Sequence, residues 1–193
     1  MSKRDDILQA ALIEFGNHDF DTASVNQIIK DANSSKGNFY HYFHNKEDLY
    51  LVLLKEAWEK KAQYMNVPYD NDIFQFLEKQ VMSGIHFSKE NPEFYQLSRQ
   101  FAKEPNKDIY QRVLLEIAKE TEMSSAKNEI NQKMTQIKKT NTIREELPED
   151  LVEQYIQFIL KHMNEFIGTE ENLEVIEKKL GFVIDVLKFG LLG

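Results

Sequence analysis

The stretch SKGNFYHYF, residues 35–43, predicts a short helix with two unlike faces. Phe39 and Phe43 lie four residues apart, so on a helix they share one face, which we expect to pack onto Phe15 and Ile28. The opposite face carries polar and basic side chains, namely Lys36, Asn38 and His41, with Tyr40 at its flank. Such side chains can contact phosphate oxygens and the edges of bases. The stretch therefore predicts a helix that buries aromatic rings and offers a polar surface.

The charge around this stretch differs from that of the whole chain. The 193 residues carry 32 Asp and Glu against 24 Lys and Arg, which gives a net charge of −8. DNA-binding proteins are usually basic, because neutralising phosphates supplies much of the affinity. Between Asp31 and Glu47, however, there is no acid, and Lys36 and Lys46 lie within this window. If DNA is the partner, we expect this window to face it.

Two further short helices are predicted before this stretch. The first runs from about Lys3 to Phe15, and we expect Gly16 to cap it in a left-handed conformation. The second follows Ser24-Val25-Asn26-Gln27, which has the pattern of a capping box in which Ser24 and Gln27 bond reciprocally. It ends near Asn33. Three short helices with a tight turn between the second and third indicate a helix-turn-helix.

Helical periodicity dominates the remainder of the chain, which predicts an all-α fold of about nine helices. Asn45 is expected to cap the fourth helix. Later helices are expected over the ranges 72–88, 92–103, 106–137 with a possible break at 119–128, 148–166 and 170–189. We divide the chain into a helix-turn-helix DNA-binding domain, residues 1–47, and an effector-binding and dimerisation domain, residues 48–193.

Several classes of protein are disfavoured. The chain has no Cys, which excludes disulfides and thiolate chemistry, and no apolar run approaches the ~20 residues that a membrane helix needs. The N-terminus lacks the pattern of a secretory signal, so we expect a cytoplasmic protein. No nucleophile–base pair or Gly-rich phosphate loop is present, and we expect neither an enzyme nor a cofactor. The spacings of His41, His44 and Asp48, and of His86 and Glu90, are weak signals for metal binding.

Three segments together resemble the DNA-binding domain of the TetR family of bacterial regulators. They are TASVNQII (22–29), SKGNFYHYF (35–43) and NKEDL (45–49), and the resemblance covers about residues 4–50. The family's turn usually reads Ala-Gly-Val-Ser, whereas this chain has Ala32-Asn33-Ser34-Ser35. Asn33 tolerates the left-handed conformation that Gly would adopt. Ser34 replaces a small buried apolar residue, which we expect to loosen the helix pair slightly.

The resemblance implies a role for each matching position. Phosphate contacts are expected from Ser24, Ser35, Tyr40 and Lys46. The edges of bases are expected to be read by Lys36, Gly37, Asn38 and His41. Gly37, which has no Cβ, would let the helix N-terminus approach DNA closely, and the N–H groups there favour anions.

The second domain suggests an effector and a dimer. Aromatic and Met side chains are frequent between Trp58 and Tyr110, and core packing and an apolar or aromatic effector pocket are both open explanations. As pocket residues we select Trp58, Phe87, Phe94 and Tyr110. The last two helices have broad apolar faces: Leu151, Tyr155, Ile159 and Met163, then Ile176, Leu180, Val183, Ile184 and Leu187. We expect these faces to pair in a homodimer, as the resemblance also implies, with core packing alone as the alternative.

The sequence therefore predicts a DNA-binding transcriptional regulator, a repressor that a small effector releases from a palindromic operator. An activator, or a regulator without an effector, would use the same parts. A helical protein-interaction module that does not bind DNA is the alternative from another class, supported by the acidic total charge. An enzyme ranks third.

Overall fold

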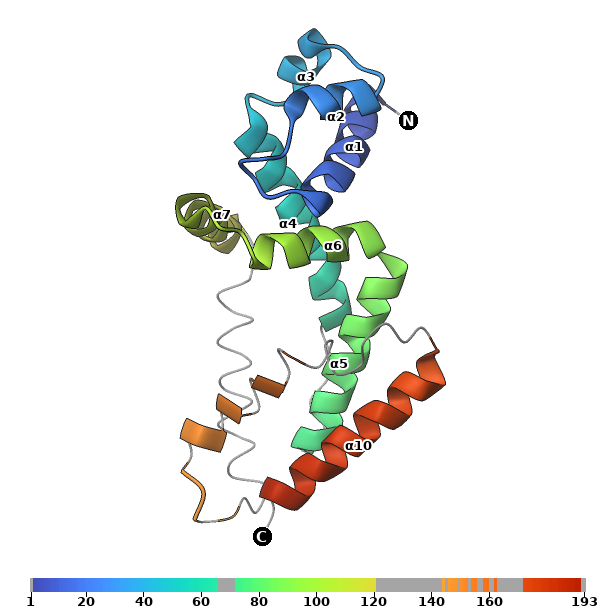
Figure 1. Cartoon of the computed structure of the whole chain (residues 1–193), viewed down its shortest axis with the longest axis vertical. Coiled ribbons are helices and arrows are strands. Elements are labelled where there is room, and N and C mark those ends of the chain that lie inside the picture. The colour runs from blue at the N-terminus through green and yellow to red at the C-terminus, as the bar shows by residue number, and fades with distance from the viewer. Residues whose placement is uncertain are drawn as a thin grey trace. The chain divides into compact units, whose positions relative to one another are not determined.

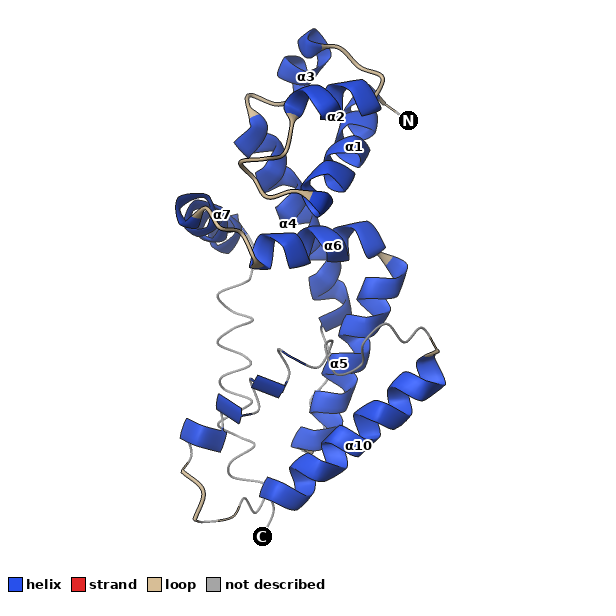
Figure 2. Ribbon diagram, viewed as in Figure 1, coloured by secondary structure: helices blue, strands red, loops and turns tan. Residues whose placement is uncertain are grey.

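The protein is all-helical throughout the part of the chain that is described. The computed structural model describes residues 2–65, 72–120, 144, 146–148, 150–152, 154–155, 158–159, 162 and 172–191. Figure 2 shows helices and loops in this part and no strand. The helices with defined bounds are α1 (Lys3–Asn17), α2 (Val25–Asp31), α3 (Lys36–Tyr42), α4 (Lys46–Met65), α5 (Ile73–Glu90), α6 (Pro92–Ala102), α7 (Lys107–Glu120) and α10 (Leu173–Leu191) (Figure 1). The predicted fold class is confirmed.

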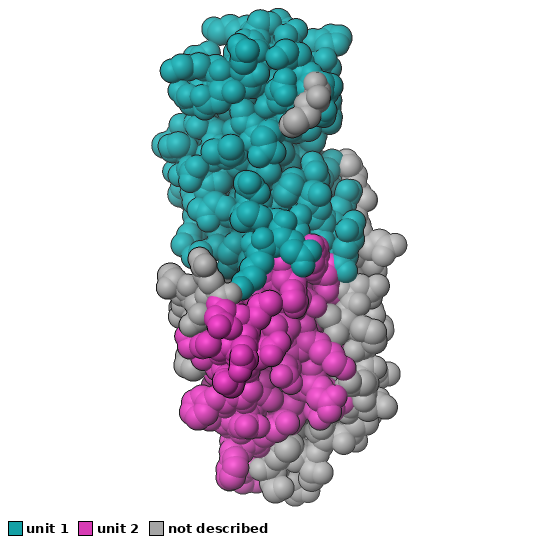
Figure 3. All heavy atoms as spheres, turned by 90° about the vertical axis from the view of Figure 1, so that its right-hand side faces the viewer, with its two compact units in different colours: residues 1–63, 87–124 teal, residues 64–86, 125–193 magenta. Residues whose placement is uncertain are grey.

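The chain divides into two compact units (Figure 3). Unit 1 comprises residues 1–63 and 87–124, and unit 2 comprises residues 64–86 and 125–193. Unit 1 thus contains the helix-turn-helix together with most of α4, all of α6 and α7. The functional boundary at residue 47 remains a prediction.

The core of unit 1 determines which face of α3 is buried. Phe39 is fully buried and Phe43 is 2% exposed, in the same apolar cluster as Phe15 and Ile28. This confirms the inward face expected from the four-residue spacing. The cluster continues beyond the helix-turn-helix into α6 and α7, with Leu97, Ile109, Val113 and Ile117. The three-helix segment and the two later helices are therefore stabilised by one core.

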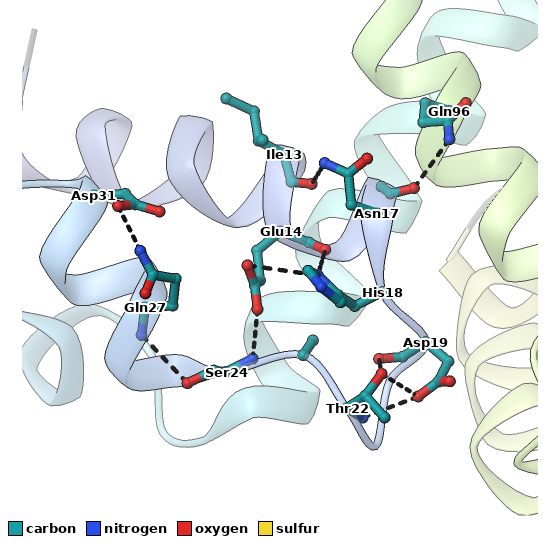
Figure 4. Close-up of polar contacts among 12 residues, drawn as sticks. Ile13, Glu14, Asn17, His18, Asp19, Thr22, Ser24, Gln27, Asp31 and Gln96 are labelled. Atoms are coloured by element: carbon teal, nitrogen blue, oxygen red, sulfur yellow. Dashed lines mark hydrogen bonds and ion pairs between the residues drawn. The ribbon is translucent and has the colours of Figure 1, made fainter.

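Gly16 serves packing rather than capping, so the expectation of a left-handed cap was wrong. Helix α1 continues to Asn17, and His18 follows it in an extended conformation with φ −130°. A Cβ on Gly16 would lie 3.3 Å from Cγ of Gln96 on α6. The Gln96 amide donates a hydrogen bond of 3.2 Å to the Gly16 carbonyl (Figure 4). The missing side chain lets α6 lie close against the end of α1.

The turn between α2 and α3 depends on Asn33. Asn33 has φ 45°, the left-handed conformation predicted for it, and is the one described non-glycine residue with positive φ. The following residue, Ser34, donates its N–H to the Ile29 carbonyl at 3.0 Å. Its hydroxyl oxygen, however, is buried and has no hydrogen-bond partner among the described residues. The turn is thus closed by the backbone while one side-chain oxygen remains unsatisfied.

Unit 2 has its own core between α5 and α10. The buried residues are Phe74, Leu77, Val81, Ile85, Val152, Ile176, Leu180, Ile184 and Leu187. Four of the α10 residues that we expected to pair with a second protomer, Ile176, Leu180, Ile184 and Leu187, are therefore buried within their own protomer. The predicted helix at 148–166 is described only in part, and Met163 and residues 121–143 lie outside the described residues.

The first turn of α4 is closed by two side chains. Asn45 accepts the Asp48 N–H at 2.8 Å, as predicted for a cap. The Asp48 carboxylate in turn accepts the backbone N–H of His44 at 2.9 Å. It also lies 3.1 Å from Nδ1 of the His44 imidazole. The N–H bond from His44 is the main reason that the pKa of Asp48 is lowered from its ordinary value.

Replacing Ser34 by Ala should stabilise the protein. The change removes a buried hydroxyl that has no partner, and we expect the free energy of unfolding to rise by about 1 kcal/mol. The adjacent serine provides the control, because the Ser35 hydroxyl accepts the Asn38 N–H at 3.1 Å. Ser35→Ala should lower stability by about 1 kcal/mol. Urea unfolding of both variants checks this, and a loss of stability in Ser34→Ala would contradict it.

The stability contributed by Asp48 should disappear in acid. Its pKa is lower in the folded than in the unfolded chain, so its contribution is present above the unfolded pKa and is lost as pH falls through the folded one. Asp48→Asn keeps the shape and cannot ionise. We therefore expect the difference in unfolding free energy between wild type and Asp48→Asn to shrink between about pH 6 and about pH 3. A difference that stays constant over this range would refute the assignment.

Candidate nucleic-acid interface

The outer face of α3 is exposed as the sequence predicted. Lys36, Gly37 and His41 are exposed, Asn38 is half-buried, and Tyr40 is 61% exposed. Ser35 precedes the helix and caps it through its hydroxyl oxygen. None of these side chains is a carboxylate. The structure thus brings the predicted α3 residues onto one surface, while their contacts to DNA remain predictions.

Ser24 is held by a bond that the sequence reading missed. Its hydroxyl oxygen accepts the Gln27 N–H at 3.3 Å, as expected for the cap of α2. The expected return bond, from the Ser24 N–H to the Gln27 side chain, is not made, and the Gln27 amide donates to Asp31 at 2.7 Å. The Ser24 N–H instead donates to the carboxylate of Glu14 on α1 at 2.8 Å (Figure 4). The Ser24 O–H is left as a potential donor, the role predicted for it.

The loop between α1 and α2 has a fixed shape. Asp19 accepts hydrogen bonds from the Thr22 N–H at 2.9 Å and the Thr22 hydroxyl at 2.7 Å (Figure 4). Both bonds lower the pKa of Asp19, and the bond from the Thr22 hydroxyl has the larger effect. These contacts position the chain that leads into Ser24.

Lys46 is partly occupied within the protein. Its ammonium group donates to the Ala23 carbonyl at 2.9 Å and to the Asp21 carbonyl at 3.3 Å. It also lies 4.7 Å from the centre of the Phe20 ring. An ammonium group has three N–H bonds, so one remains for a phosphate. The phosphate role of Lys46 remains a prediction, beside a role in holding the α1–α2 loop that the sequence did not suggest.

The corner between α6 and α7 is tied to the same loop by a buried carboxylate. Glu104 has no solvent exposure, and it accepts the Phe20 N–H at 3.0 Å and the Asn106 N–H at 3.1 Å. The Asn106 amide also donates to the Asp21 carboxylate at 3.0 Å. The Tyr50 hydroxyl is buried beside Glu104 and has no hydrogen bond to any described residue. The pKa of Tyr50 is raised, mainly by burial and next by the charge of Glu104.

A residue of α7 also reaches the start of α4. The Arg112 guanidinium donates to both oxygens of Glu47, at 2.9 Å from Nε and 3.2 Å from Nη2. These bonds raise the pKa of Arg112 above its already high ordinary value. Glu14, Glu104 and Arg112 were all missed in the sequence, because their partners lie 10 to 84 residues away.

The described residues do not form a metal site. No group of three or more His, Asp or Glu side chains among them is arranged to hold a metal ion. His44 contacts Asp48 in the first turn of α4 instead. No described helix has both the length and the apolar character needed to cross a membrane.

The four predicted effector residues lie in unit 1. Trp58 and Phe94 are partly buried against its core, and Phe87 is 1% exposed. Tyr110 stacks on Phe101 with ring centres 4.9 Å apart. Core packing accounts for the contacts of Trp58 and Phe94. The part of all four residues in an effector pocket remains a prediction.

Some known proteins are similar to this chain over the helix-turn-helix and its surroundings. The sequence pattern described as "Bacterial regulatory proteins, tetR family" matches residues 7–53. The regulator QacR of Staphylococcus aureus is 34% identical over 68 residues, which is 32% of this chain and 36% of that protein. The chain thus matches about a third of the length of the first curated relatives.

Other comparisons extend over nearly the whole chain. The transcriptional repressor AcnR of Corynebacterium efficiens is 21% identical over 184 residues, 95% of this chain and 91% of that protein. A solved TetR family regulator from Chloroflexus aurantiacus has a TM-score of 0.72 at 21% identity and covers 98% of this chain and 93% of its own. The likeness of fold therefore includes the helices that follow the helix-turn-helix. Residues 7–53 therefore carry the sequence pattern of the TetR family, and the fold over nearly the whole chain is similar to that of a solved TetR family regulator.

Proposed function

We propose that this chain is a repressor that binds a palindromic operator as a homodimer and is released by a small effector. The observation that carries the proposal is the exposed face of α3, which bears Lys36, Asn38 and His41 and no carboxylate. A face of this kind fits the major groove, where bases present acceptors and donors in distinct patterns. The name of the Corynebacterium efficiens relative, a transcriptional repressor, supports repression over activation.

Two kinds of contact would hold the operator. Ser24, Ser35, Tyr40 and Lys46 would bind phosphates, which positions the protein without reading sequence. The side chains of Lys36, Asn38 and His41 would contact base edges, with Gly37 allowing close approach. The hydroxyl oxygens of Ser24 and Ser35 already accept helix N–H groups, so each serine would offer its O–H to a phosphate.

The dimer would form through apolar residues of unit 2 that the protomer leaves exposed. On α10, Phe182 is 64%, Val186 50% and Phe189 91% exposed, at the i, i+4, i+7 spacing of one helix face. Leu151, Tyr155 and Phe158 of the preceding segment are also exposed. Large apolar side chains gathered on one helix face favour association with a second copy. Leu151 and Tyr155 belong to the surface that we first expected. On α10, the exposed residues take the place of the expected ones that are buried within the protomer.

The effector would be small and apolar or aromatic, near Trp58, Phe87, Phe94 and Tyr110. It would act only through different affinities for the DNA-bound and free conformations. DNA must then weaken effector binding by the factor by which effector weakens DNA binding.

The alternative is a helical protein-interaction module that does not bind DNA, which the net charge of −8 favours. Selection from a random duplex pool, followed by a salt titration on the selected duplex, separates the two. A repressor should enrich a palindromic sequence and lose affinity steeply as salt rises. Failure to bind any duplex at low salt would reject the proposed function.

Lys36→Ala should reduce the affinity for the selected duplex by about 1–3 kcal/mol, or about 5- to 150-fold, if Lys36 holds a guanine. Binding to a scrambled duplex should change little. Fluorescence anisotropy measures both affinities. Lys103→Ala, at an exposed position just after α6, is the control for loss of one positive charge. An equal loss on both duplexes would show that Lys36 contacts only phosphate.

Phe182→Glu combined with Phe189→Glu should convert the dimer into monomers, because two charges would be buried in the apolar contact. Light scattering after size exclusion measures the mass. Leu115→Glu on α7 is the control, because Leu115 is also an exposed apolar residue (61%), and this variant should remain dimeric. A dimeric double variant would place the interface elsewhere.

A further inference from the structure

Two carboxylates border the acid-free window at the start of α4. Asp48 is satisfied locally, because it accepts the His44 N–H. Glu47 is satisfied from far along the chain, by the two-bond contact with Arg112 of α7. Both acids at this end of the window are therefore engaged, and Glu47 is paired with a full positive charge.

The position of Glu47 makes its charge important for DNA binding. It occupies the first turn of α4, directly after Lys46, where backbone N–H groups favour an approaching phosphate. An uncompensated carboxylate there would repel that phosphate. A planar guanidinium that forms two parallel bonds to the carboxylate cancels most of this field. The side chains of Arg112 and Glu47 are 55% and 39% exposed, so the pair contributes little to stability.

We propose that Arg112, outside the helix-turn-helix, raises the affinity for DNA by neutralising Glu47, an inference that rests on the proposed function. Arg112 acts as a positioning residue that works through charge. The start of α7 is held near the α1–α2 loop by Glu104, which accepts the Phe20 N–H, and by Asn106, which donates to Asp21. A movement of α7 that separated Arg112 from Glu47 would expose a negative charge at the DNA surface.

A charge cycle in the full-length protein tests this. Wild type, Arg112→Ala, Glu47→Gln and the double variant are compared by fluorescence anisotropy on the duplex selected by the wild type. Arg112→Ala should weaken binding about three- to tenfold, because Glu47 is then uncompensated. Glu47→Gln should bind at least as tightly as wild type. The double variant should recover to within about twofold of wild type, since no carboxylate remains to be neutralised.

Two further readouts exclude a structural explanation. The melting temperature of Arg112→Ala should stay close to that of wild type, because the pair is exposed. The difference in affinity should shrink as salt rises from about 50 mM to about 500 mM, because exposed charges are screened. Arg99→Ala on α6, whose guanidinium lies 5.8 Å from the Tyr95 ring centre, is the control for loss of an Arg charge.

Each outcome decides the matter. If Arg112→Ala binds as tightly as wild type, or if the double variant stays as weak as Arg112→Ala, the inference is overturned. In the second case Arg112 acts directly on DNA or through packing. If the wild type itself binds no duplex, the proposed function fails first, and the two failures are therefore distinguishable.

Discussion

The burial of Phe39 and Phe43 constrains everything that α3 can do. Both rings lie in the cluster that also contains Phe15 and Ile28, so α3 cannot rotate about its axis without exposing them. The outward face is thereby fixed, and with it the set of side chains that can meet a partner. Because Leu97 of α6 and Val113 of α7 belong to the same cluster, this constraint extends beyond the helix-turn-helix. The exposed face of α3 and the later helices of unit 1 therefore depend on the same buried cluster.

Local features of the fold could be predicted because their causes are local. The spacing of the two aromatic residues, the caps at Ser24, Ser35 and Asn45, and the left-handed Asn33 each depend on residues within four positions. The missing bond from the Ser24 N–H to Gln27 has a cause outside the local pattern. Gln27 found a partner in Asp31, and the Ser24 N–H was satisfied from α1. Neither choice follows from the four-residue pattern.

Residues that tie distant segments together could not be predicted. In the sequence, Glu104 is one acid between two predicted helices and Arg112 is one charged residue of a predicted helix. Only the fold shows that Glu104 is buried and that Arg112 bonds to Glu47. The apolar residues of α10 show a related difficulty. The sequence indicated that α10 has more apolar surface than one face requires, but only the packing against α5 shows which part is buried internally. The exposed face of α3 could be predicted because the absence of Asp and Glu between Asp31 and Glu47 is visible in the sequence itself.

The contact between Gly16 and Gln96 limits how this protein can diverge. The two positions are 80 residues apart, yet even a methyl group at the first would press on the second at 3.3 Å. The side chain that would have to move also donates the bond to the Gly16 carbonyl, so yielding space would strain that bond. Positions 16 and 96 are therefore expected to covary among homologues, with a larger residue at one accompanied by a shorter one at the other.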